Sequence, residues 1–228
     1  MERSKILVWD LPTRLAHWLL AASFVGAFAT GDSERLRDVH IILGYTMLGL
    51  VVFRVVWGLV GTRYARFSSF AFGPRSVLSY LGSLFRGKPQ HYAGHNPAGS
   101  WAIYALLLST VLAGATGYAT YSGMGGGWME ELHEGAANAL LAVVIVHVLG
   151  VIVSSILHRE NLVGGMLGGR KSGRPGDAVR HRHVLVGVAL VLAVATFWYA
   201  GPGYLTAPGI GADQATQSPR YSAHRDGD

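Results

Sequence analysis

The sequence predicts an all-α fold, specifically a transmembrane helical bundle. Of its 228 residues, 50% are hydrophobic and only 14% are charged. Together with a positive mean hydropathy, this is far from the balance of a soluble domain. Five apolar runs approach the length of about 20 residues that a helix needs to cross a hydrocarbon core of about 30 Å. These runs cover residues 15–30, 40–61, 101–121, 132–157 and 184–200.

The charges between these runs predict the orientation of the helices. Basic residues precede the first run, fill the segment after the second and follow the fourth, so the positive-inside rule places these segments in the cytoplasm. Segments 31–39 and 122–131 are mixed to acidic and are expected outside. The protein is therefore expected to be a multi-pass protein of the bacterial inner membrane, in contact with lipid, with a cytoplasmic N-terminus and a periplasmic C-terminus. The basic residues are Arg3, Lys5, Arg14, Arg63, Arg66, Arg75, Arg86, Lys88, Arg159, Arg170, Lys171, Arg174, Arg180 and Arg182.

The remaining elements follow in chain order. The first run is expected to be a retained helix, because Trp18 interrupts it and no small-residue cleavage pattern follows Gly31. Apolar residues at helical spacing after Pro74 predict a short helix, either on the membrane surface or packed over the bundle. Residues 173–183 are expected to be a cytoplasmic linker, 184–200 a fifth transmembrane helix, and 201–228 a periplasmic, mostly disordered tail.

Composition also excludes several classes of function. The chain contains no cysteine, which rules out disulfides, thiolate-bound iron–sulfur clusters and covalent attachment of a c-type haem. The net charge of +6 does not indicate a nucleic-acid partner, because the basic residues lie in particular loops and not on one soluble face.

Histidines are the main candidates for function. Four of the ten lie in or at the ends of predicted spans, namely His17, His40, His133 and His147. His133 and His147 are fourteen residues apart, which on a helix gives a rise of about 21 Å and a rotation of about 40°. Pairing by depth gives His17 with His147 on the inner side and His40 with His133 on the outer side. Two haems, each bound by two histidines and stacked across the membrane, fit this pattern.

Simpler interpretations were weighed against this one. A single histidine at a helix end is often an interfacial side chain, but four at two matching depths are harder to explain that way, and a proton relay would need acidic partners that the spans lack. Arg54 lies fourteen residues after His40, at the inner level, where it could pair with a haem propionate or snorkel to the interface. His91, His95 and His158 lie in segments expected in the cytoplasm. A metal site is discounted there, because the two-histidine loop of His91 and His95 has no nearby carboxylate or thiolate.

The sequence resembles the bacterial cytochrome b561 family, which includes b-type cytochrome subunits of nickel–iron hydrogenases and formate dehydrogenases. The resemblance covers about residues 6–172 and implies a four-helix membrane domain, residues 1–172, with two non-covalent haems b. It also implies His17, His40, His133 and His147 as the axial ligands of iron. The residues that carry it are Val8-Trp9-Asp10, Pro12, Arg14, His17-Trp18, His40, Gly44-Tyr45, Arg54, Trp57-Gly58, Gly61, Ala65-Arg66-Phe67, His95-Asn96-Pro97-Ala98-Gly99, Trp101, His133, His147, Glu160-Asn161-Leu162, Met166 and Gly169-Arg170-Lys171.

The expected function is electron relay between the quinone pool and a periplasmic partner, either a c-type cytochrome or a dehydrogenase or hydrogenase module. No residue is predicted to be catalytic, so enzyme activity beyond quinone oxidoreduction is left open. A homodimer is possible. A stand-alone superoxide:quinone oxidoreductase is the first alternative, but it would favour a basic outer surface for steering the anion. A non-redox transporter or scaffold is the second.

Overall fold

The computed structural model describes residues 4–205 of the chain, mostly as helices that run side by side. The helices are α1 (Leu11–Thr30), α2 (Arg37–Val60), α3 (Pro74–Phe85), α4 (Pro97–Tyr121), α5 (Gly127–His158), α6 (Leu162–Gly168) and α7 (Val184–Leu205). The strands are β1 (Ser4–Leu7) and β2 (Arg170–Gly173), and short 3-10 turns lie at Glu34–Leu36, Phe67–Ser69 and Pro175–Asp177.

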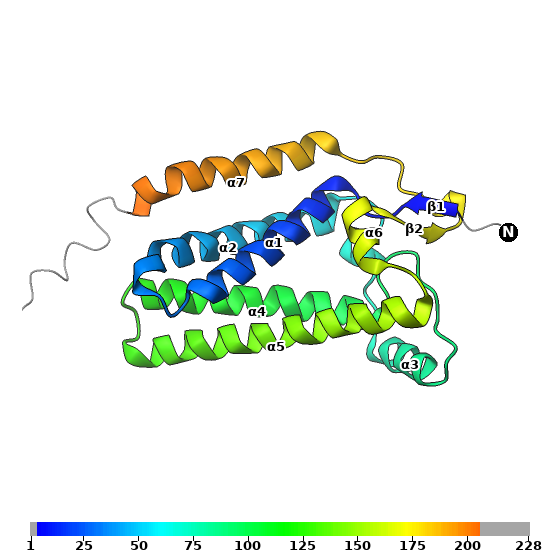
Figure 1. Cartoon of the computed structure of the whole chain (residues 1–228), viewed down its shortest axis with the longest axis horizontal. Helices are drawn as coiled ribbons and strands as arrows, with labels where there is room; N and C mark the ends of the chain where they lie inside the picture. The colour runs from blue at the N-terminus through cyan, green and yellow to red at the C-terminus, as the bar shows by residue number, and fades with distance from the viewer. Residues whose placement is uncertain (1–3, 206–228) are drawn as a thin grey trace, which may run out of the picture.

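The long helices form two hairpins and an outer helix. Helices α1 and α2 pack as one hairpin, α4 and α5 pack as the other, and α2 also contacts α4. Helix α7 lies along the outside of α1 and α2 (Figure 1). This arrangement confirms the predicted fold class, a helical bundle with a four-helix core and a fifth, C-terminal helix.

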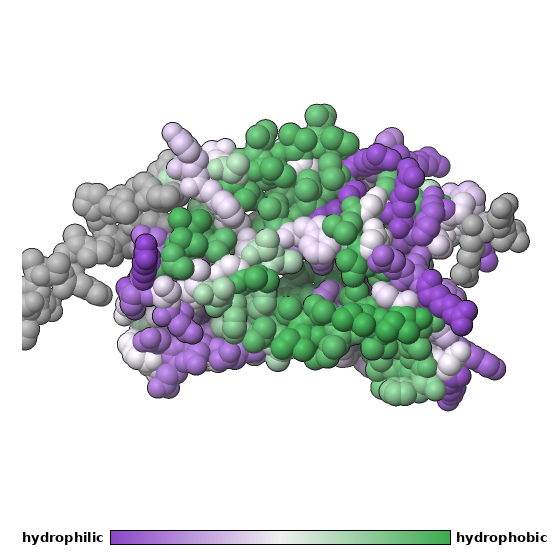
Figure 2. Space-filling model, viewed as in Figure 1, coloured by the Kyte–Doolittle hydropathy of each residue, from purple (hydrophilic) through white to green (hydrophobic). Residues whose placement is uncertain are grey.

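Surface hydropathy fits a membrane position. Three described helices are long and apolar enough to cross a bilayer, over Glu34–Val60, Pro97–Tyr121 and Gly127–His158. Helix α1 falls outside this group and carries Arg14 and His17, while the apolar stretch of α7, Val184–Ala200, is shorter. Figure 2 shows apolar side chains across the middle of the visible face and hydrophilic ones towards both ends. The sidedness of the membrane and the division into domains stay predictions.

Side-chain caps fix where the helices begin. The carboxylate of Asp10 accepts a hydrogen bond from the backbone N–H of Thr13 at 2.9 Å, and Asn96 accepts one from Gly99 at 2.7 Å. Each cap is followed closely by a proline, Pro12 in α1 and Pro97 in α4. Proline has no backbone N–H, and this costs nothing in the first turn of a helix, where an N–H has no partner within the helix. These caps set the rotation at which each helix enters the bundle.

A small antiparallel sheet joins the N-terminus to the segment after α6, with Ser4 opposite Gly173 and Leu7 opposite Arg170. No pattern in the sequence predicts this sheet. The carbonyl oxygen of Gly169 extends the connection, because it accepts from the backbone N–H groups of Val8 and Trp9 at 2.8 and 3.0 Å. An apolar cluster of Ile6, Val8, Trp9 and Tyr64 lies under this sheet.

The segment expected to be a linker contacts the same region. The N–H of Val179 donates to the carbonyl oxygen of Leu7 at 2.8 Å, and the N–H of Leu11 donates to that of Arg182 at 3.1 Å. Helix α7 then continues to Leu205, past the predicted end of the fifth span at residue 200. The rest of the predicted tail, residues 206–228, lies outside the described residues.

The predicted short helix after Pro74 is α3. It turns Tyr80 and Ser83 inward and leaves Leu78, Leu81 and Phe85 exposed. Exposed apolar residues spaced by three and four positions form one side of a helix, as expected where a helix lies against the surface of a membrane.

A polar contact within an apolar interface attaches helix α7 to the bundle. The indole Nε1–H of Trp198 donates to the hydroxyl of Thr46 in α2 at 2.9 Å. Leu190 packs with Ala16 of α1 and Leu50 of α2. Because the Thr46 hydroxyl itself donates to the carbonyl oxygen of Ile42 at 2.7 Å, it stays paired when the indole is removed.

We therefore expect Trp198→Phe to lower the free energy of unfolding by about 0.5–1 kcal/mol, the scale of an interhelical hydrogen bond in a membrane protein. Unfolding in mixed detergent micelles would measure this. The matched control is Tyr199→Phe, because the Tyr199 side chain is 92% exposed. Equal effects of the two substitutions would argue against the Trp198–Thr46 contact as an anchor.

Candidate functional site

Two pairs of histidine rings face each other between the two hairpins. His17 of α1 and His147 of α5 have ring centroids 6.4 Å apart. His40 of α2 and His133 of α5 have centroids 6.0 Å apart. The structure thus brings together the same pairs that their depth in the sequence suggested. We call His17 with His147 the inner pair and His40 with His133 the outer pair.

The ring spacing is suited to a metal ion held between two imidazoles. An imidazole nitrogen binds a metal at about 2.0–2.1 Å and lies about 1.1 Å from its ring centre, so two rings on opposite sides of one ion have centroids about 6.2 Å apart. Rings in edge-to-face contact also have centroids about 4.5–7 Å apart, so this spacing fits an ion between the rings but does not by itself require one. Both observed separations lie within a few tenths of an ångström of the expected value.

Backbone carbonyl groups fix which nitrogen of each outer ring is free. The Nδ1 atom of His40 lies 2.8 Å from the carbonyl oxygen of Ala27, and the Nδ1 atom of His133 lies 3.0 Å from that of Ala113. Because a carbonyl oxygen only accepts hydrogen bonds, Nδ1 of each ring carries the proton and Nε2 keeps its lone pair. This is the usual state of a histidine that binds a metal through Nε2.

A cavity of about 320 Å³ surrounds the outer pair. Its walls include Phe24, Leu48 and Leu140, and its outer end carries Glu34, Arg37 and Glu130. Glycine makes room beside the ligand ring, because a Cβ atom at Gly117 would lie 2.8 Å from the His133 imidazole. The cavity therefore has apolar walls, two facing imidazoles and a charged mouth, which suits a flat, largely apolar cofactor that binds metal.

The inner pair has different surroundings. Nδ1 of His17 is buried and has no hydrogen-bond partner among residues 4–205. Arg54 is only 8% exposed, and its guanidinium lies over the ring of Phe67 at 4.9 Å and that of Phe70 at 5.8 Å. Its Nη1 atom is also buried without a partner. Arg54 is thus held inside the protein, not extended along the surface to water.

Sequence reasoning missed the part played by Asp10. This residue is completely buried. Besides capping α1, its carboxylate accepts from Trp57 Nε1 at 3.1 Å and from the Thr62 hydroxyl at 2.6 Å. Asp10 thus joins the start of α1 to the end of α2, beside the inner pair. An aspartate two residues before a proline, at the start of an apolar run, is a helix-capping signal that could have identified it.

His95 was set aside as a metal ligand, yet it lies at the inner end of the bundle between two aromatic rings. Its ring centroid is 4.5 Å from that of Trp9 and 4.5 Å from that of Phe70. Burial, and after it the charge of Arg54, lowers the pKa of His95 to about 3, so the ring is neutral at physiological pH. The signal in the sequence is Asn96-Pro97, which caps the next helix and places His95 just before it.

The loop that carries His95 is held by Lys171 of β2. The ammonium group of Lys171 donates to the carbonyl oxygens of Tyr92 at 3.3 Å and Gly94 at 3.4 Å, and it lies 3.9 Å from the carboxylate of Glu160. Burial lowers the pKa of Lys171, and Glu160 opposes that effect. The small sheet therefore has a structural purpose, because it places a buried cation against this loop.

A family model described as prokaryotic cytochrome b561 matches residues 8–169, a range that contains all four paired histidines. Curated relatives named "Probable Ni/Fe-hydrogenase B-type cytochrome subunit" are similar over most of their length. The protein of Rhizobium leguminosarum bv. viciae is 24% identical over 217 residues, covering 75% of this chain and 90% of the relative. That of Azotobacter chroococcum mcd 1 is 27% identical over 213 residues, covering 74% and 89%. No solved structure is significantly similar to the chain.

The Asp10 network generates a test of how the inner end is held. We expect Asp10→Asn to lower the free energy of unfolding by about 1–3 kcal/mol. The substitution replaces one accepting carboxylate oxygen by an NH2 group, so a buried donor that bonded to that oxygen would lose its acceptor. Denaturant unfolding in detergent would measure this loss. Asp32→Asn, in an exposed loop, is the matched control, and a loss no larger than that of the control would contradict the assignment.

Proposed function

Because the chain belongs to the prokaryotic cytochrome b561 family, we propose that it is a multi-pass membrane b-type cytochrome that binds two haems b and passes electrons across the bilayer. The observation that carries this proposal is that four histidines from three helices meet as two facing pairs, with ring centroids 6.4 and 6.0 Å apart. Each value suits one iron ion with an imidazole on either side.

In this proposal His17 and His147 bind the inner haem and His40 and His133 bind the outer one. When bound, each haem supplies reversible one-electron exchange at an iron that has no open coordination position. The protein contributes the orientation of the ligands. On the outer side, the carbonyl groups of Ala27 and Ala113 hold the two rings through Nδ1, which leaves Nε2 of each ring free to bind a ligand in the cavity that both rings line.

Arg54 is proposed as a partner of an inner haem propionate. Its guanidinium is buried, it has an unpaired Nη1 atom, and it lies on the same helix as His40 but fourteen residues further inward. A buried cation needs an anionic partner. Asp10 attracts it electrostatically, but the Asp10 carboxylate already accepts three hydrogen bonds, from Thr13, Trp57 and Thr62.

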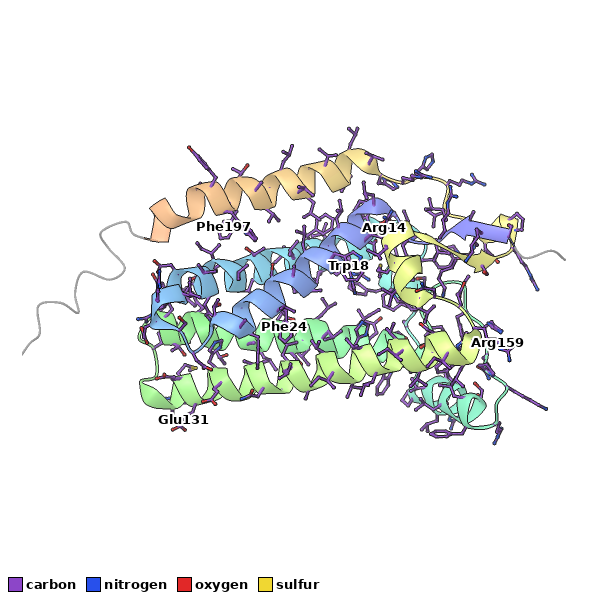
Figure 3. The ribbon with its side chains drawn as sticks, viewed as in Figure 1. Arg14, Trp18, Phe24, Glu131, Arg159 and Phe197 are labelled. Atoms are coloured by element: carbon purple, nitrogen blue, oxygen red, sulfur yellow. The ribbon has the colours of Figure 1, made fainter. Side chains whose placement is uncertain are left out.

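We propose that electrons pass between the membrane quinone pool and a periplasmic partner at the outer end. The names of the relatives make a hydrogenase module the favoured partner, with a c-type cytochrome or a dehydrogenase as other members of the same class. The outer cavity supports this, because loop residues line it and so bring its cofactor close to the surface. Figure 3 shows Glu131 and Arg159 at opposite ends of α5, an asymmetry of charge that fits an outer end and a cytoplasmic end.

The two other functions considered from sequence are less well supported. A superoxide oxidase would favour a basic entrance to the cavity, because positive charge attracts the superoxide anion. The entrance here carries two acidic residues, Glu34 and Glu130, and one basic residue, Arg37. A transporter without a cofactor would not need paired imidazoles at the separation of an iron ion. Membership of a cytochrome family also favours a redox function.

The test is haem quantification with reduced-minus-oxidised visible spectra of the detergent-purified protein. We expect two haems b per chain. His40→Ala and His133→Ala should each lose the same haem, and His17→Ala and His147→Ala should each lose the other, because removal of one axial ligand opens the iron. His181→Ala, at an exposed position, is the control. A colourless protein, or loss of both haems in every variant, would overturn the proposed arrangement.

Gly117 provides a test specific to the outer site. A Cβ atom there would meet the His133 ring at 2.8 Å, and such overpacking costs about 1–3 kcal/mol. We expect Gly117→Ala to reduce occupancy of the outer haem while the inner haem is retained, as measured by haem per chain. Gly49→Ala is the control, because nothing lies within 4 Å of a Cβ at that position. Full occupancy in Gly117→Ala would show that the ring can move without losing its ligand role.

A further inference from the structure

Buried polar atoms without partners gather at the inner end of the bundle. They include Oγ1 of Thr13, Nδ1 of His17, Nη1 of Arg54 and Nδ1 of His95. A buried donor or acceptor left unpaired costs about 1–3 kcal/mol, and native proteins contain few of them. His17 is assigned to iron through its other nitrogen, so the unpaired atoms of Thr13, Arg54 and His95 indicate a polar ligand that these three residues share.

Three elements supply these atoms. Thr13 and His17 lie one turn apart on α1 and so face the same way. Arg54 comes from α2, and His95 comes from the loop before α4. His95 and the Arg54 guanidinium are neighbours, because both lie against the ring of Phe70. The unpaired atoms thus lie around the inner imidazole pair.

His95 is held rigidly in this position. Trp9 and Phe70 enclose its ring, each with a centroid separation of 4.5 Å, and Phe70 in turn lies against the Arg54 guanidinium. Lys171 fixes the preceding backbone by donating to Tyr92 and Gly94. A side chain held from two faces and by its own loop loses little further entropy when it binds a ligand.

The neighbouring charged groups do not compete for the same ligand. The Asp10 carboxylate is occupied by its three donors, and the Lys171 ammonium by two carbonyl oxygens and Glu160. The groups left available are the Arg54 guanidinium, the Nδ1–H of His95 and the hydroxyl of Thr13. This set of donors suits an anion with several oxygen atoms.

We propose that His95 and Thr13, together with Arg54, bind the propionate carboxylates of the inner haem. The inference rests on the proposed function, since it requires a haem at the inner pair. Nδ1–H of His95 and the Thr13 hydroxyl donate to carboxylate oxygens while Arg54 balances the charge. The propionate edge of the inner haem therefore points to the cytoplasmic end, and His95 is a cofactor-binding residue and not an iron ligand.

The test compares two substitutions of His95 in the full-length protein carrying both haems. His95→Asn keeps an amide N–H close to the position of Nδ1, whereas His95→Ala removes the donor. The readouts are the midpoint potential of the inner haem at pH 8 and the affinity of the apoprotein for haem at the inner site. The same substitutions in a His40→Ala background, which keeps only the inner haem, assign the signal.

We expect His95→Ala to weaken haem binding at the inner site about tenfold, the value of one hydrogen bond to a charged group. It should also lower the midpoint potential of that haem, because an uncompensated propionate favours the ferric ion. His95→Asn should restore both values towards those of the parent. Thr13→Val, which removes only the hydroxyl, should shift both in the direction of His95→Ala.

The control is His91→Ala, four residues earlier in the same loop and exposed, which should leave both values unchanged. Equal effects of His95→Ala and His95→Asn would mean that only packing is involved and would overturn the proposal. A shift in the outer haem, or none in either, would also overturn it. Absence of haem from the unsubstituted protein would instead reject the proposed function, so the two failures are distinguishable.

Discussion

Every imidazole ring between the two hairpins has two nitrogen atoms that need partners, because no bulk water reaches the interior of a helical membrane bundle. For His40 and His133, the backbone carbonyl groups of Ala27 and Ala113 satisfy one nitrogen of each ring. The other nitrogen, Nε2, is left for a ligand where the two rings come together. The distance between the hairpins is therefore constrained by what the facing rings hold, and small residues such as Gly117 keep that space open.

The inner end of the bundle is organised differently from the outer end. Asp10 ties α1 to α2, and Arg14 donates to the carbonyl oxygens of Met166 and Leu167 in α6 (Figure 3). The small sheet brings Lys171 against the loop before α4. These contacts close the inner end with protein, whereas the outer pair lies in a cavity lined partly by loop residues. One histidine pair is thus enclosed and the other lies near the surface.

Local sequence patterns predicted the helices well, because apolar runs and capping residues act over a few positions. The bounds differ where a helix extends beyond its apolar part: α5 begins at Gly127 and includes Glu130 and Glu131, which belong to the polar end. The facing of His133 and His147 followed from their spacing. The pairing of Leu7 with Arg170 did not, since four-residue strands so far apart in the chain leave no periodic signal. The enclosure of His95 by Trp9 and Phe70 likewise depends on three segments that meet only in the folded protein.

The placement of both His133 and His147 on α5 has a consequence for energy conversion. Fourteen helical residues span about 21 Å, roughly two-thirds of a hydrocarbon core of about 30 Å. A charge that crosses a whole bilayer works with or against about 2.3 kcal/mol per 100 mV, so an electron passing between the two levels senses roughly 1.5 kcal/mol per 100 mV. In the proposed orientation, movement from the outer to the inner level is directed towards the negative side of an energised membrane. With two haems bound as proposed, electron transfer in that direction is therefore electrogenic and slows as the membrane potential rises.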